Sequence, residues 1–79
     1  DLTTYLGYRP NNPDIWYERA LTFRRLGDEN AALSDLNQAI RMNPNAAIYY
    51  RERSRVHQAL GNAQQANADA QRAQQLGGQ

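Results

Sequence analysis

Arginine is the residue type of this chain best suited to recognition chemistry, because all nine basic residues among the 79 are arginine and none is lysine. Arg51 and Arg55 are four residues apart, a spacing that puts both guanidinium groups on one face of a helix. A guanidinium is a planar set of donors that suits carboxylates, singly or in bidentate pairs. The sequence therefore favours recognition of carboxylate groups.

Residues that support catalysis or metal binding are few. The chain has no cysteine and a single histidine, His57, which excludes disulfides, thiolate nucleophiles and clustered His or Cys metal sites. Ser34 and Ser54 have no evident base partner, so a nucleophile, a base and an orienting residue cannot be assembled. We therefore predict that the chain is not an enzyme and needs no cofactor or metal.

Length and charge narrow the classes of protein further. Seventy-nine residues make at most one small domain, and a net charge of +1 is low for a dedicated nucleic-acid binder. Tyr17, Tyr49 and Tyr50 lie among arginines and keep RNA binding as a less favoured alternative. The longest apolar runs are far shorter than the roughly 20 residues that span a bilayer, so no membrane span is expected. Nothing in the sequence indicates a cellular compartment.

The elements that must position these residues repeat at an offset of 34 residues. The matched residues include Trp16 with Tyr50, Glu18 with Glu52, Arg19 with Arg53, Leu26 with Leu60, Gly27 with Gly61, Asp35 with Asp69, and Asp1 with Asp35. We therefore predict the end of one repeat at 1–12, a full repeat at 13–46 and a second, terminal repeat at 47–79.

Each repeat is predicted to be two helices joined by a glycine turn. The expected helices lie near 14–26, 30–42, 47–60 and 63–76, with a helical remnant at 1–8. The expected N-caps are Asn12, Asp28, Asn45 and Asn62, and the turns follow Leu26-Gly27 and Leu60-Gly61. No segment alternates with a period of two, so the predicted fold class is all-α.

Apolar side chains are expected to form one stripe on each helix of 13–46. The stripes consist of Trp16, Ala20, Phe23 and Leu26 on the first helix, and Ala32, Leu36, Ala39 and Ile40 on the second. A lone helix pair leaves its flanks uncovered, so stability should come from stacking.

The two ends of the chain differ in their expected surfaces. The last helix is rich in Ala and Gln and offers little apolar surface on its outward flank, as is typical of a terminal repeat. A partly helical low-complexity tail is the alternative. At the other end, Leu2, Tyr5 and Leu6 would be exposed and would favour a homo-oligomer.

Six positions of each copy resemble the tetratricopeptide repeat (TPR) family, whose pattern is a bulky residue, a small one, an aromatic, then Ala, Ala and Pro. These positions hold Trp16, Ala20, Phe23, Ala32, Ala39 and Pro44 in the first copy, and Tyr50, Ser54, His57, Ala66, Ala73 and Gly78 in the second. The resemblance covers the whole chain, which looks like a C-terminal fragment of about two and a third repeats. It implies antiparallel helix-turn-helix repeats stacked as a right-handed superhelix.

The resemblance also implies a non-catalytic protein-interaction or scaffolding module whose first helices line a concave groove for a peptide or partner segment. The candidate groove residues are Tyr17, Leu21, Arg24, Arg51, Arg55 and Gln58. One branch of the family clamps the C-terminal carboxylate of a chaperone with Lys and Asn at these places. Arg51 and Arg55 resemble half of that clamp, but Tyr17 and Leu21 stand where the other half would be.

We therefore expect an acidic or carboxylate-bearing segment of a partner, held by the arginines beside Tyr17. A solvated arginine face is one alternative. The other is a structural segment of a longer array that mediates self-association or assembly.

Arg19 and Arg53 stand where the family usually has a leucine. An arginine near a helix interface is costly unless a carboxylate meets it, so we predict structural ion pairs. The candidate pairings are Arg19 with Asp1 or Asp35, and Arg53 with Asp35 or Asp69. The alternative is that these groups are solvated, with Arg72 as a local partner of Asp69.

Overall fold

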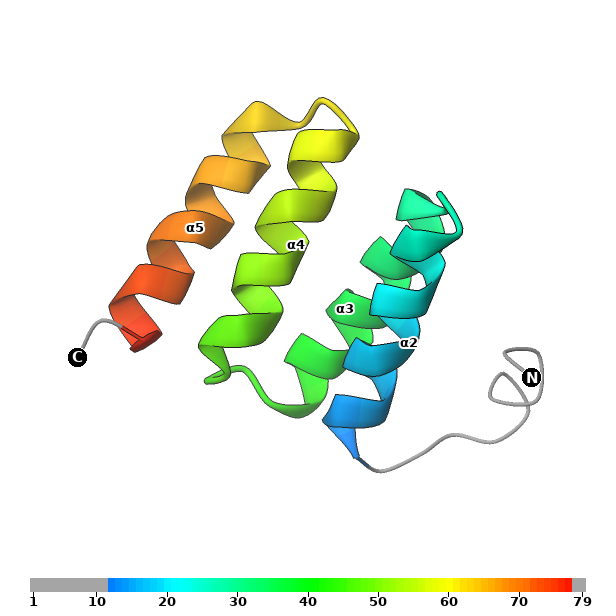
Figure 1. Cartoon of the computed structure of the whole chain (residues 1–79). Coiled ribbons are helices and arrows are strands. Elements are labelled where there is room, and N and C mark those ends of the chain that lie inside the picture. The colour runs from blue at the N-terminus through cyan, green and yellow to red at the C-terminus, as the bar shows by residue number, and fades with distance from the viewer. Residues whose placement is uncertain (1–11, 78–79) are drawn as a thin grey trace.

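The computed structural model describes residues 12–77, and these residues form four helices. The helices are α2 (Pro13–Arg25), α3 (Glu29–Met42), α4 (Ala47–Ala59) and α5 (Ala63–Gly77). They form two antiparallel hairpins, α2 with α3 and α4 with α5, which stack side by side through α3 and α4 (Figure 1). The all-α prediction is thereby confirmed for the described part of the chain.

Local capping fixes where the helices of the first hairpin begin. The Asn12 side chain accepts a hydrogen bond from the Asp14 backbone N–H at 3.0 Å, and Pro13 occupies the first helical position, where a missing N–H costs nothing. The Asp28 side chain likewise accepts from the Ala31 N–H at 3.1 Å. Both caps agree with the sequence prediction.

The start of α4 corrects the sequence prediction. Ala46, not Asn45, is the N-cap of α4, and no side chain caps this helix. The Asn45 backbone N–H donates to the Asn43 side-chain oxygen at 3.3 Å, so these asparagines shape the turn between the hairpins.

Two glycines allow each hairpin to close. Gly27 and Gly61 have φ values of +83° and +82°, a left-handed conformation that glycine adopts without strain. Successive helices therefore reverse direction immediately after Leu26 and Leu60.

The core lies between the hairpins as well as within them. Ala20, Ala32, Leu36 and Val56 are fully buried and form one cluster to which both hairpins contribute. Tyr17, Phe23, Leu33 and Leu60 pack around this cluster. The expectation for Leu26 is wrong, because this residue is the C-cap of α2 and its side chain is 69% exposed.

The second hairpin reproduces the first at the offset of 34 residues. Helix α2 begins at Pro13 and α4 at Ala47, while α3 begins at Glu29 and α5 at Ala63. The predicted helix at 1–8, Asp1 and the apolar flank of Leu2, Tyr5 and Leu6 lie outside the described residues. No helix within 12–77 has the length and apolar character required to cross a membrane.

Candidate functional site

Two arginine–aspartate pairs join the helices within the hairpins. Arg19 on α2 donates from Nε and Nη2 to the two carboxylate oxygens of Asp35 on α3, both at 2.7 Å. Arg53 on α4 makes the same bidentate contact with Asp69 on α5 at 2.7 and 2.8 Å. Each arginine therefore pairs with the aspartate of its own hairpin, 16 residues later, and Asp1 lies outside the described residues.

The two pairs differ in their surroundings. The side chains of Arg19 and Asp35 are 5% and 3% exposed, and the Arg19 guanidinium lies 5.0 Å from the Trp16 ring centroid and 5.5 Å from that of Phe23. Hydrogen bonding to Asp35 raises the pKa of Arg19 despite the opposing effect of burial. Arg53 is more exposed and also donates to the Asn37 side chain at 2.9 Å, which links the second hairpin to the first. These pairs are structural contacts.

The candidate groove residues lie on the first helix of each hairpin, and we call this surface the α2/α4 face. It consists of Tyr17, Leu21 and Arg24 on α2 and Arg51, Arg55 and Gln58 on α4. Leu21 and Arg24 line a pocket of about 590 Å³ together with Arg25 and Glu52. Arg51, Arg55 and Gln58 line a separate pocket of about 500 Å³.

Arg24 is occupied by contacts within the protein. It donates from Nη1 to Glu52 Oε2 at 2.7 Å and from Nε to Glu29 Oε1 at 3.0 Å. The hydrogen bond to Glu52 is the main cause that raises the pKa of Arg24. Because both carboxylates come from the chain itself, Arg24 is a link between the hairpins and a poor candidate for holding a ligand.

Arg51 and Arg55 present their guanidinium groups to solvent. The Arg55 side chain is 60% exposed, and its one ion pair within residues 12–77 is a 3.3 Å contact with Glu52, which Arg24 already holds at 2.7 Å. Arg51 is exposed and makes no ion pair with another described residue. The face therefore retains cationic donors that no carboxylate of residues 12–77 fully satisfies.

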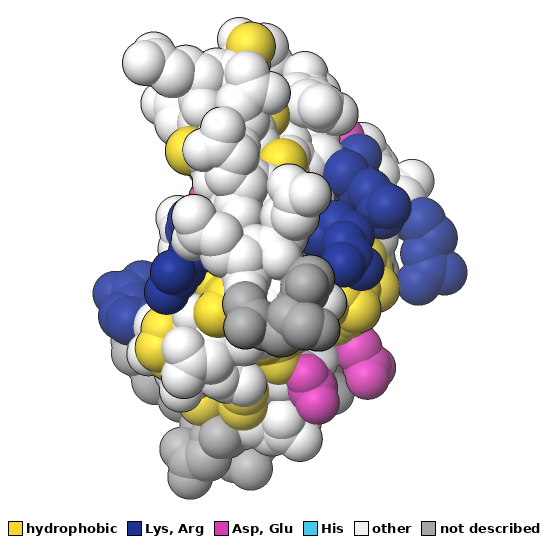
Figure 2. Space-filling model, turned by 90° about the vertical axis from the view of Figure 1, so that its left-hand side faces the viewer, with side chains coloured by type: hydrophobic (Ala, Val, Ile, Leu, Met, Phe, Trp, Pro, Cys, Tyr) yellow, Lys and Arg dark blue, Asp and Glu magenta, His cyan; other side chains and the backbone are white. Residues whose placement is uncertain are grey.

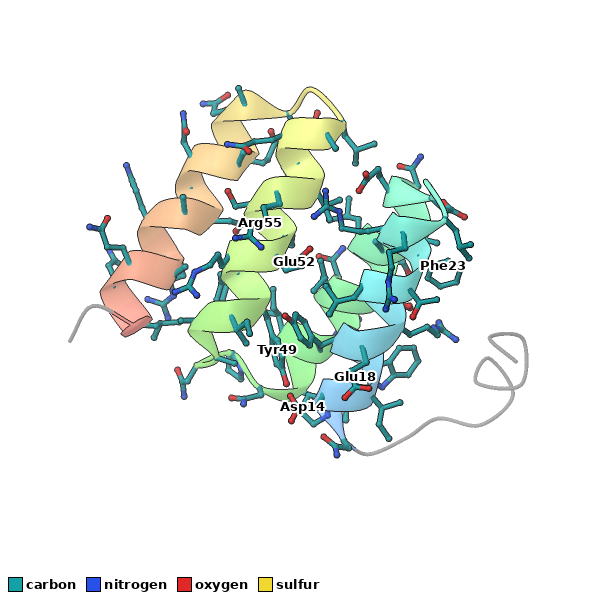
Figure 3. All side chains as sticks on the ribbon, in the orientation of Figure 1. Asp14, Glu18, Phe23, Tyr49, Glu52 and Arg55 are labelled. Atoms are coloured by element: carbon teal, nitrogen blue, oxygen red, sulfur yellow. The ribbon has the colours of Figure 1, made fainter. Side chains whose placement is uncertain are left out.

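A tyrosine pair lies beside these arginines. The Tyr49 hydroxyl on α4 donates to the Asp14 carboxylate at the start of α2, and the Tyr17 and Tyr49 ring centroids are 5.4 Å apart (Figure 3). Tyr49 is 2% exposed, whereas Tyr17 is only partly buried. Burial is the main cause that raises the pKa of both phenols. Tyr17 thus supplies a fixed, partly apolar wall next to Arg51 and Arg55.

Glu52 and Tyr49 were not among the residues singled out by the sequence. Glu52 is 28 residues from Arg24, and Arg24 has Gln58 as its counterpart 34 residues later, so this ion pair does not repeat. Tyr49 and Asp14 are 35 residues apart, and Asp14 has Ile48 as its counterpart. Contacts that join the two hairpins once leave no periodic signal, unlike the pairs within each hairpin.

The residues weighed for catalysis are separated in the structure. His57 lies at the α4–α5 interface, with Nδ1 3.3 Å from the Asn62 amide nitrogen and Nε2 3.8 Å from the Asp69 carboxylate. The Ser54 hydroxyl donates to the Ala66 carbonyl at 2.7 Å, and Ser34 is exposed on α3. No group of three His, Cys, Asp or Glu side chains within 12–77 is arranged to hold a metal ion.

Comparison with protein families gives a match to the family model described as tetratricopeptide repeat, over residues 13–46. These residues coincide with the α2–α3 hairpin and its flanking turns. The family is a non-catalytic module that serves in protein–protein interaction or scaffolding. With this match, the paired helices and the repeated capping pattern, the chain is a tetratricopeptide repeat protein.

Proposed function

We propose that this chain is a protein-interaction module whose α2/α4 face binds an acidic or carboxylate-bearing segment of a partner protein through Arg51 and Arg55. The observation that carries the proposal is the contrast among the arginines of this face. Arg24 is satisfied by two carboxylates, while Arg55 has only a shared contact and Arg51 has none within residues 12–77. Two guanidinium groups four residues apart form a donor set that matches carboxylates.

We further propose that residues 47–79 form a second repeat of the same family and that residues 1–12 end a preceding one. Support for the second repeat comes from the offset of 34 residues between the helix starts and between the two glycine turns. Support for the first is the match of Asp1 with Asp35 in the sequence alone.

The tyrosine surroundings favour a protein ligand over RNA. Tyr49 and Tyr50 are 2% and 8% exposed, and the Tyr50 hydroxyl donates to the Pro44 carbonyl at 2.9 Å. Base stacking needs open aromatic faces, which these two buried rings do not present.

The test compares binding of an acidic peptide and a neutral peptide of matched length to the wild type and to Arg51→Ala/Arg55→Ala. Loss of both arginines should weaken acidic-peptide binding about tenfold or more, since a charge-assisted hydrogen bond contributes about 1.5–3 kcal/mol and 1.4 kcal/mol corresponds to tenfold. Arg41→Ala/Arg72→Ala is the matched control, because it removes two exposed arginines from α3 and α5. An equal loss for both peptides, or an equal effect of both double variants, would refute the proposal.

A further inference from the structure

The end of the molecule formed by α4 and α5 carries a groove of about 500 Å³, which we call the end groove. Its lining includes Arg51, Ser54, Arg55 and Gln58 from α4, and Ala70 and Ala73 from α5. Figure 2 looks onto this end of the molecule, where arginine side chains gather at the edges of a mostly neutral surface. The groove therefore combines a neutral floor with a cationic rim.

The first hairpin shows what fills the equivalent groove. The residues 34 positions earlier are Tyr17, Ala20, Leu21, Arg24, Leu36 and Ala39, and helix α4 lies against them. Val56 packs with Ala20 and Leu36 in the core, and Tyr49 lies against Tyr17. Glu52 binds Arg24 at 2.7 Å. The natural occupant of such a groove is thus a helix that presents side chains at the spacing of 49, 52 and 56.

The end groove has the same framework and different chemistry. Arg51 replaces Tyr17 and Arg55 replaces Leu21, so an incoming helix meets two cations where α4 met an aromatic ring and an aliphatic chain. On the floor, exposed Ala70 replaces fully buried Leu36. The smaller floor residue leaves room for a larger apolar side chain than Val56.

We infer that the end groove binds an acidic amphipathic helix of a partner protein. Two of its carboxylates, three residues apart, would lie opposite Arg51 and Arg55, and a leucine four residues later would lie over Ala70 and Ala73. Charge complementarity selects this occupant, because Arg51 has no ion-pair partner within 12–77 and Arg55 shares Glu52 with Arg24. The inference rests on the proposed function, since both use the same two arginines, and it names the shape of the ligand.

The probes are three synthetic peptides. The first is an alanine-based helix with Glu, Glu and Leu at the spacing of 49, 52 and 56, and the second has Gln in place of each Glu. The third has the composition of the first with a central proline that breaks the helix. Fluorescence anisotropy gives the Kd of each, and sedimentation of the protein alone gives its oligomeric state.

Two pairs of variants separate the end groove from the rest of the α2/α4 face. Ala70→Phe fills the groove floor, and Ala68→Phe is its matched control, because Ala68 is exposed on α5 and does not line the groove. Tyr17→Ala alters the face outside the groove, and Arg51→Ala/Arg55→Ala removes the shared cations. Circular dichroism checks that each variant is folded.

The inference predicts that the Glu helix binds at least tenfold more tightly than the Gln helix and the proline peptide. Arg51→Ala/Arg55→Ala and Ala70→Phe should each weaken it at least tenfold, while Ala68→Phe and Tyr17→Ala leave it within threefold. If Tyr17→Ala weakens binding and Ala70→Phe does not, the ligand lies across the α2/α4 face, and the proposed function stands while the inference fails. If the Glu helix binds no better than the Gln helix, both fail. A dimer that Ala70→Phe dissociates would make a second copy the occupant and overturn the partner helix.

Discussion

Single arginine side chains in this protein differ by the carboxylates that meet them. Arg19, Arg24 and Arg53 each donate to a carboxylate at 2.7 Å and hold helices together. Arg51 and Arg55 project from α4 with one long contact between them, to Glu52. The same residue type therefore serves cohesion inside the molecule and recognition at its surface.

The Arg19–Asp35 pair gives a prediction for stability. Arg19→Leu leaves the buried Asp35 carboxylate without its bidentate partner, so the free energy of unfolding should fall by about 3–5 kcal/mol. The double variant Arg19→Leu/Asp35→Leu removes both charges and should recover most of this loss. Urea unfolding followed by circular dichroism measures both. A single variant that unfolds like the wild type, or like an Arg41→Leu control, would contradict the structural role of the pair.

Tyr49 gives a prediction for alkaline pH. Its pKa is raised from the ordinary value of 10.0 by burial and by the bond to Asp14, so the folded state holds the phenol proton more tightly than the unfolded state. The stability from this proton is complete below pH 10 and is lost as pH rises above 10, because only the unfolded state then releases the proton readily. The urea midpoint should therefore fall above pH 10, and Tyr49→Phe should make that fall shallower. Equal slopes for the two proteins would contradict the assignment.

At the scale of helices, capping explains most of what could be predicted from the sequence. Asn12 and Asp28 begin α2 and α3, and Gly27 and Gly61 close the turns, because these are local effects of residue type. Asn45 failed as a cap because Asn43 binds its backbone N–H and the helix begins one residue later than that cap requires. Leu26 fitted the apolar spacing of α2 but occupies its C-cap, where the stripe no longer faces the core.

The candidate site was predictable only where it repeats. Arg19 and Asp35 recur as Arg53 and Asp69, so the period brought them to notice and the structure has both pairs bonded. The Glu52 contacts occur once, across the stack, and decide that Arg24 is occupied while Arg55 remains exposed. Such a distinction depends on packing between hairpins, which no local pattern encodes.

The uncapped start of α4 gives a prediction for helix stability. Ala46 has the extended backbone of an N-cap, with φ −93° and ψ 106°, but offers no acceptor to the first turn. Ala46→Ser should raise the free energy of unfolding by about 1 kcal/mol, and Asp28→Ala should lower it by about the same amount. Thermal or urea unfolding tests both. A serine that brings no gain would mean that the first turn of α4 is already satisfied in another way.

At the scale of the whole molecule, stability depends on the contact between the hairpins. Val56 of α4 is fully buried with Ala20, Ala32 and Leu36 of the first hairpin, and Glu52 and Arg53 add polar links to Arg24 and Asn37. In a stacked array each unit is stabilised by its neighbours, so this contact should couple the two hairpins into one unfolding transition.

Val56→Ala tests that coupling. Loss of two methyl groups at the buried contact should cost about 1–3 kcal/mol and let the second hairpin unfold before the first. The single tryptophan, Trp16 on α2, reports the first hairpin by fluorescence, while circular dichroism reports both. The two probes should give coincident midpoints for the wild type and separate ones for Val56→Ala. Coincident midpoints in the variant would show that the hairpins are not coupled through Val56.

The central claim is that Arg51 and Arg55 recognise carboxylates of a partner protein, and an exchange of charges tests it most directly. The measurement is the Kd of the Glu helix and of a matched helix with Lys in place of each Glu, for the wild type and for Arg51→Glu/Arg55→Glu. The wild type should prefer the Glu helix, and the charge-reversed variant should prefer the Lys helix, each about tenfold or more. Unchanged preference in the charge-reversed variant would contradict the claim.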